Sequence, residues 1–290
     1  MRCTHCLLLS LTTLLFSCLQ AQVLYRCTSP GNDTVTYLLG THHGLPRQHY
    51  YYDSLYTQLL SRCEVVFVET NVLDSGQARR DFLKQAGRIA VFTGGRSLTD
   101  YLSDGQIAQL KDFYRLEFGI SGERFDRSLK LTPFFLHQRF FGSDTTRVSV
   151  DKLINQDAQL LKKEIVSLDE PEQLLATYTW FSQSISPDSL LNLAAGYGAI
   201  REQHRLLDTA YLAQDTAGIN RFIRTVYSAV FRNELIHRRN RLWEEMLMTR
   251  SRKTNFIAAG IAHISFTGGL LEFYRGRNYR VEPVDLRTRQ

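Results

Sequence analysis

Short apolar runs bounded by turn residues mark the strands that the sequence predicts. Residues 65–68 are β-branched or aromatic and end at Glu69, and such a continuous run is typical of a strand buried on both faces. The turn-rich residues 29–33 separate two further runs and predict a hairpin. In all, we expect strands at residues 23–28, 34–39, 65–68, 164–168, 255–259 and 279–284.

Apolar residues at helical spacing dominate the rest of the chain. Helices are expected over residues 50–61, 151–162, 232–248 and 269–275, and over most of 75–144 and 171–250. Because the strands cluster towards the two ends, we predict an α/β (α+β) fold. Its mixed central sheet is built from both chain ends, and the large helical middle segment covers it. No shift in composition marks a linker, so we expect a single domain over residues 22–290.

The first residues have the pattern of a signal peptide. Arg2 precedes an apolar stretch from Cys6 to Leu19, and Ala21 supplies a small residue before a polar one. We therefore expect residues 1–21 to be removed, leaving an exported, periplasmic or extracellular protein without a transmembrane segment. The alternative is a lipoprotein anchored at Cys18, because residues 15–18 resemble a lipoprotein processing box.

Composition narrows the class of partner. A hydrophobic content of 43% and a charged content of 22% exclude wholesale disorder. The formal net charge is +6, but basic residues are interspersed with acidic ones along the helices, so we expect no nucleic-acid partner. No G-x-S-x-G elbow, Walker loop, H-E-x-x-H helix or dinucleotide fingerprint is present, which excludes the common forms of those enzyme classes.

Two cysteines follow the predicted leader, Cys27 and Cys63. In an oxidising compartment they could form one disulfide around the first G-x-x-H motif. Two buried free thiols are the alternative, because sequence gives no distance between them.

The candidate chemistry lies in two similar motifs. In each, an apolar strand ends at a glycine, Gly40 or Gly260, and a histidine follows three residues later, His43 or His263. Glycine permits unusual backbone dihedrals and close approach of neighbouring atoms. Glu69 also closes an apolar strand, and a carboxylate buried there needs a partner. If these strands are neighbours, two imidazoles and a carboxylate converge, although His42 leaves the choice of histidine open.

These motifs resemble those of the TraB/GumN family, which is related to the Tiki proteases. The family carries an N-terminal G-T-x-H, a strand ending in V-E and a C-terminal G-x-x-H, and residues 37–43, 65–70 and 256–284 match them in order and spacing. One departure is Leu168-Asp169, where the family usually has Leu-Glu. The resemblance covers nearly the whole mature chain, but only the end motifs are specific.

The resemblance implies a metal-dependent hydrolase, a Tiki-like metallopeptidase acting on a peptide or small-molecule substrate. His43 and His263 would hold a divalent ion such as manganese, cobalt or zinc, and Glu69 would be the third ligand or the general base. The alternative is a non-catalytic protein that binds metal, haem or peptide, because relatives include such binders.

Arg239 and Asn240 match a weaker family feature. They lie in a charge-rich run, so a solvated helix face is one interpretation. The other is substrate binding, or anchoring of a carboxylate in the site.

Overall fold

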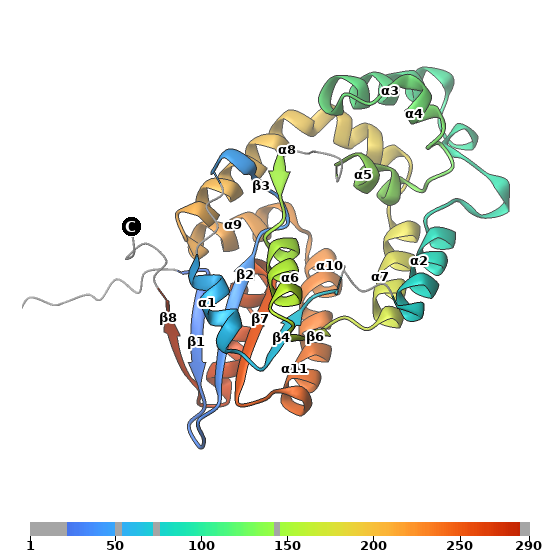
Figure 1. Ribbon diagram of the computed structural model, residues 1–290. Coiled ribbons are helices and arrows are strands. Elements are labelled where there is room, and N and C mark those ends of the chain that lie inside the picture. Colours follow the sequence, from blue (N-terminus) through green and yellow to red (C-terminus); the bar gives the residue numbers. More distant parts are fainter. Residues whose placement is uncertain (1–21, 50–53, 72–75, 142–145, 285–290) are drawn as a thin grey trace, which may run out of the picture.

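The centre of the protein is a six-stranded mixed sheet with the order β6-β4-β7-β2-β1-β8 (Figure 1). The computed structural model describes residues 22–49, 54–71, 76–141 and 146–284, so the predicted leader and Cys18 lie outside the described residues. The strands are β1 (Leu24–Thr28), β2 (Val35–Thr41), β4 (Val65–Val68), β6 (Glu164–Ser167), β7 (Thr254–Gly260) and β8 (Arg280–Pro283).

The sheet combines parallel and antiparallel strands. Strands β6, β4, β7 and β2 are parallel, whereas β1 is antiparallel to both β2 and β8. The predicted mixed sheet is confirmed, and all six predicted runs form strands. Its central strands come from both chain ends, and the edge strand β6 comes from the middle. The hydrophobic pattern did not indicate the two-residue strands β3 (Leu45–Pro46) and β5 (Arg147–Val148), which pair with each other.

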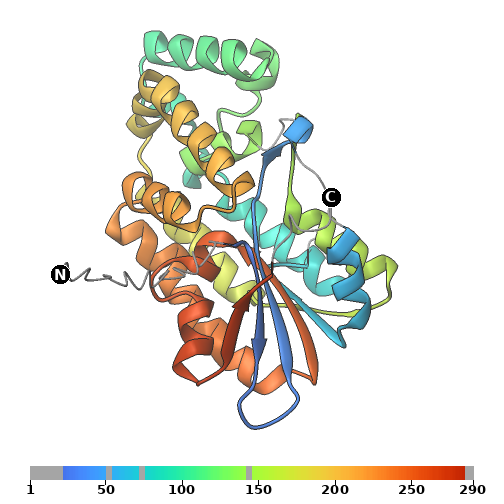
Figure 2. The ribbon, with the colours of Figure 1, turned by 90° about the vertical axis from the view of Figure 1, so that its left-hand side faces the viewer.

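Helices cover both faces of the sheet, which is why every residue of β4 is buried. α1 and α6 lie on one face, and α11 and α13 lie on the other (Figure 2). The helices are α1 (Ser54–Arg62), α2 (Gln77–Ile89), α3 (Asp104–Phe118), α4 (Gly122–Asp126), α5 (Pro133–Phe141), α6 (Val150–Leu160), α7 (Pro171–Ser184), α8 (Asp188–Leu212), α9 (Thr216–Val226), α10 (Ala229–Arg232), α11 (Arg238–Arg250), α12 (Ile261–Ser265) and α13 (Leu270–Gly276).

A helical lobe extends beyond the sheet (Figure 1). Within it, α3, α4, α5 and α8 enclose a second apolar core around Tyr114, Phe125 and Phe140. Three short 3₁₀ turns, η1 (Arg47–His49), η2 (Thr93–Gly95) and η3 (Leu98–Asp100), connect elements of the chain. No helix of the described residues is long and apolar enough to cross a membrane.

One helix contains a local change of winding. α10 and α11 are joined by the π-helical turn η4 (Asn233–His237), and the residues that flank it keep right-handed helical dihedrals. The chain is therefore one continuous helix from Ala229 to Arg250 with a wide turn inside it. Such turns are often found at functional sites.

Both cysteines of the described chain are free, buried thiols. Cys27 lies on β1, and Cys63 lies two residues before β4. Strands β7 and β2 lie between β4 and β1 in the sheet. Neighbouring strands are about 4.8 Å apart, so the thiols are too distant for a disulfide. The alternative of two buried free thiols describes the structure.

Candidate functional site

Polar side chains gather where the four parallel strands end. His43 follows β2, Glu69 follows β4, Asp169 follows β6 and His263 follows β7. Since β4, β7 and β2 are direct neighbours, the condition that the sequence set for convergence is met. Crevices at the carboxyl ends of parallel strands are where open α/β sheets place ligands.

Glu69 is the centre of this group. Its Oε1 accepts a hydrogen bond from the backbone N–H of Gly260 at 2.6 Å and lies 3.9 Å from Nε2 of His43. Its Oε2 accepts one from Nη2 of Arg239 at 2.5 Å. Burial alone would raise the pKa of Glu69, but the charge of Arg239, with that of His43 and the hydrogen bond from Gly260, holds it well below its usual range. Glu69 is therefore ionised at neutral pH.

Arg239 joins two carboxylates. Its guanidinium also donates to Asp169 through Nε at 3.0 Å and Nη2 at 2.5 Å, and the side chain of Asp169 is only 2% exposed. The indole Nε1 of Trp243 donates to the same carboxylate at 2.9 Å, and the guanidinium lies 4.8 Å from the centre of the indole ring. The solvated-face interpretation of Arg239 is therefore wrong, and the structure places it as the anchor of the site carboxylates.

Asn240 fixes the tautomer of His263. Its amide nitrogen donates to the carbonyls of His263 and Gly268, so its oxygen must accept the hydrogen bond from Nδ1 of His263 at 2.7 Å. The lone pair on Nε2 of His263 then accepts from Nη1 of Arg239 at 3.0 Å. Burial, aided by the charge of Arg239, lowers the pKa of His263 to about 3, so the ring is neutral. Asn240 is 1% exposed, which makes it a support for the histidine and not a surface residue.

His43 is held through its Nδ1 nitrogen, as His263 is. Its Nδ1 lies 2.8 Å from Oδ2 of Asp151, and Thr41 donates to the second oxygen of that carboxylate. Asp151 lies in the first turn of α6, which Ser149 caps. The side chain of His43 is 68% exposed, and the charge of Asp151 raises its pKa to about 9.

The structure also separates the two adjacent histidines. His42 turns away from Glu69, and its Nε2 lies 3.2 Å from the carboxylate of Asp208. Arg147 donates twice to that carboxylate, at 2.7 and 2.9 Å, and its Nε donates to the carbonyl of Gly44. This buried group holds the loop after β2, and it leaves His43 as the histidine that faces the site.

The two motif glycines provide space. A Cβ on Gly260 would lie 3.0 Å from Oε1 of Glu69 and 3.1 Å from Nε2 of His43. A Cβ on Gly40 would lie 3.1 Å from Cα of Ile261 and would clash with its side chain. Neither glycine has a positive φ, so close approach, and not unusual dihedrals, explains both residues.

The donor atoms suit a divalent ion only in part. His43 and Glu69 are close enough to share an ion as they stand, because ligand bonds are about 2 Å long. The Nε2 lone pair of His263, however, already accepts a hydrogen bond from Arg239. Within the described ranges no three His, Cys, Asp or Glu side chains are placed to hold an ion together. The pair therefore fits a metal, and the triad fits only if Arg239 releases His263.

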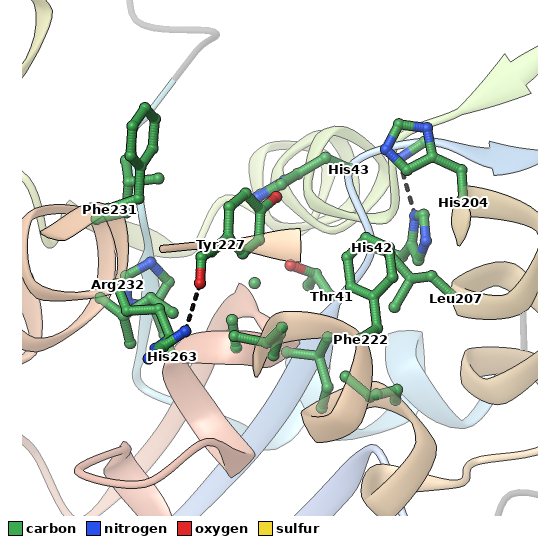
Figure 3. A pocket seen from close by; sticks show the side chains of 18 of the residues that line it. Thr41, His42, His43, His204, Leu207, Phe222, Tyr227, Phe231, Arg232 and His263 are labelled. Carbon is green, nitrogen blue, oxygen red and sulfur yellow. Dashed lines mark hydrogen bonds between the residues drawn. The ribbon is translucent and has the colours of Figure 1, made fainter. Parts of the chain in front are cut away.

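Part of this group borders a cavity of about 390 Å³ (Figure 3). His43, Arg239, Gly260 and His263 contribute to its lining. A reacting group placed there would have both imidazoles among its neighbours.

The sequence did not identify two members of this group as site residues. Asp151 is 108 positions from the histidine that it holds, and an acid in a helical first turn is ordinary. Trp243 has the spacing of a core residue. Asp169 was noted only as a departure from the family pattern, yet its shorter side chain still reaches Arg239.

The sequence comparison agrees with the geometry. The model of the TraB/PrgY/gumN family matches residues 23–283, which include every residue of the site. No curated protein gives a significant match.

Proposed function

Because this chain belongs to the TraB/PrgY/gumN family, we propose that it is an exported, metal-dependent hydrolase of peptide or small-molecule bonds. Its ion would be held by His43 and Glu69, and by His263 once Arg239 releases it. The bound ion would supply a more acidic water and a polarised carbonyl.

The observation that carries this proposal is the way both histidines are held. Asp151 contacts Nδ1 of His43, and Asn240 accepts from Nδ1 of His263. In both rings the partner fixes the orientation through Nδ1, so Nε2 is the nitrogen that a ligand would use. An ion would replace the proton on Nε2 of His43 and the contact of Arg239 with Nε2 of His263. Histidines that bind metals are held in this manner by carboxylates, carbonyls or water.

The contacts of Glu69 favour ligation over proton transfer. Each of its oxygens accepts a strong hydrogen bond, from Gly260 or Arg239, and these bonds stabilise the ionised form. A general base works best with a pKa near the operating pH, so a carboxylate held in this way is a weak base. We therefore assign Glu69 as a ligand whose charge offsets that of the ion.

The alternative is a non-catalytic binder, and one observation favours it. Arg239 hydrogen-bonds His263 and Glu69 at once, so a cation already occupies the position between them. A protein that never releases this guanidinium would hold an ion weakly and would lack a complete site.

Elemental analysis beside peptide hydrolysis separates these functions. The wild-type protein should bind manganese, cobalt or zinc and hydrolyse a peptide mixture, and a chelator should abolish both. His43→Ala, His263→Ala and Glu69→Gln should each remove most metal and activity, without additive effects when combined. His237→Ala is the matched control, because this histidine packs on Phe266 and does not border the cavity.

Three outcomes are informative. Metal without turnover would indicate the binder. Loss of ion binding with Glu69→Gln confirms the ligand, whereas retained binding with lost activity would assign a base. Wild-type metal content and activity in both His→Ala proteins would refute the site.

A further inference from the structure

Part of the cavity lining is apolar. Its members come from α8, α9, α10, η4 and the residue after α9: Leu207, Phe222, Ile223, Tyr227, Phe231 and Leu235. Figure 3 shows Phe231 on one side, Leu207 and Phe222 on the other, and His43 between them. We call the part of the cavity that these side chains line the apolar chamber. The volume of the whole cavity falls within the range of about 300–1,000 Å³ that is usual for ligand pockets. An apolar group that entered it would be next to the reactive side chains.

Arg232 adds a charge to this chamber. It borders the cavity, and its Nη1 donates to two backbone carbonyls, those of Arg224 and Tyr227. Among the ion pairs of the described residues none includes Arg232. The carbonyls orient the guanidinium without neutralising it.

The other two arginines of the cavity differ from Arg232 in this respect. Arg147 is paired with Asp208, and Arg239 is paired with Glu69 and Asp169. Arg232 therefore remains the uncompensated arginine of the described lining. A planar guanidinium in this state is suited to a carboxylate.

We infer that the substrates are peptides with a free carboxyl terminus and a bulky apolar residue near it. The apolar side chain occupies the chamber, the terminal carboxylate binds Arg232, and the bond to be hydrolysed lies upstream of that residue, at His43 and Glu69. This inference rests on the proposed hydrolase function. The inference identifies the substrate class from the charge of Arg232 and the apolar surface of the chamber, and hydrolysis itself requires neither.

Binding measured without turnover tests the inference independently of the reaction. Four fluorescein-labelled hexapeptides of one sequence would end in Phe or Ser, each as the free acid and as the amide. They would be titrated into the full-length protein by fluorescence anisotropy in a chelating buffer. The wild type should bind the Phe acid at least about tenfold more tightly than the Phe amide or the Ser acid.

The variants assign each preference to a residue. Arg232→Gln should remove the preference for acid over amide and retain that for Phe over Ser. Arg221→Gln, an exposed charge change on α9, is its control and should retain both. Phe231→Ser should weaken the preference for Phe, and Val230→Ser, 61% exposed beside it, should not.

Several results would overturn the inference. Equal affinity for acid and amide in the wild type, or an acid preference that survives in Arg232→Gln, removes the role of this arginine. Displacement of the Phe acid by dodecanoate at lower concentration than by unlabelled peptide would assign the chamber to a fatty acid. If these preferences hold while no peptide is hydrolysed, the hydrolase proposal fails and the binding site stands.

Discussion

Replacing Arg239 by Met tests the electrostatic account of the site. The substitution keeps much of the side-chain volume and removes the charge between two carboxylates that are 13% and 2% exposed. Removing one partner of a buried ion pair costs about 3–5 kcal/mol. Loss of the contact with the Trp243 ring adds about 1 kcal/mol. At about 2–4 °C per kcal/mol, the combined loss of about 4–6 kcal/mol should lower the melting temperature by roughly 15 °C.

The pH dependence gives this prediction a sign. In the wild type the pKa of Glu69 lies below its unfolded value of about 4.3, so its stabilising contribution is present above that pH and is lost in acid. Without Arg239, burial raises the pKa of Glu69 above the unfolded value, so the folded variant loses stability as pH rises. Both effects increase the difference in the free energy of unfolding between wild type and variant as pH rises from 4 to 8.

Urea unfolding followed by circular dichroism, in a chelating buffer, would measure that difference. Arg239→Met combined with Asp169→Asn should regain part of the lost stability, because it removes one unpaired charge. A destabilisation below about 1 kcal/mol that does not change with pH would refute the reasoning.

Three further predictions concern other parts of the molecule. Gly260→Ala should lower metal affinity about 10- to 100-fold with little loss of stability, because its Cβ would crowd Oε1 of Glu69. Gly276→Ala is the control, since a Cβ there meets open space, and it should bind metal as the wild type does. Calorimetric titration with the metal would compare the two variants. Burial lowers the pKa of His137 to about 4, so the folded protein favours the neutral imidazole. This preference contributes about 3 kcal/mol to the free energy of unfolding above about pH 6.5, and the contribution is lost as pH falls to 4. His137→Gln should flatten this part of the stability curve, and an unchanged slope in urea unfolding would contradict it. Mass spectrometry should show a mature N-terminus near Gln22; an intact Met1 would refute export, and a lipidated Cys18 would select the lipoprotein alternative.

The strand-end residues of the site could be predicted because one rule places them. Parallel strands align their carboxyl ends, so a residue that follows a strand lies at that edge of the sheet. Which site residues it can contact then depends only on which strands are neighbours. Glu69 and His43 lie close together for this reason, and Arg239 links His263 to Glu69. The contact of Asp151 with His43 could not be inferred, because it depends on how α6 packs beside β4 and β7, which no local pattern encodes.

Arg239 and Asn240 show a second limit. Their charge-rich surroundings favoured the interpretation of a solvated helix face. That interpretation also assumed the same helical winding throughout. The π-helical turn before them breaks that assumption and leaves no hydrophobic signature. The glycines show a third limit, because sequence indicated that glycine was needed but did not distinguish space from dihedral freedom.

The π-helical turn also affects how this protein can change by insertion and deletion. Each residue of an α-helix turns the chain by about 100°, so removing one residue from Asn233–His237 would restore regular winding. Because a wide turn accommodates one extra residue, Arg232 and Phe231 would keep nearly the same orientation relative to Arg239. With α11 held by buried Trp243 and Leu247, both ends of the turn would stay where they are. The wide turn thus lets the segment between Arg232 and Arg239 change in length by one residue without moving the side chains on either side of it.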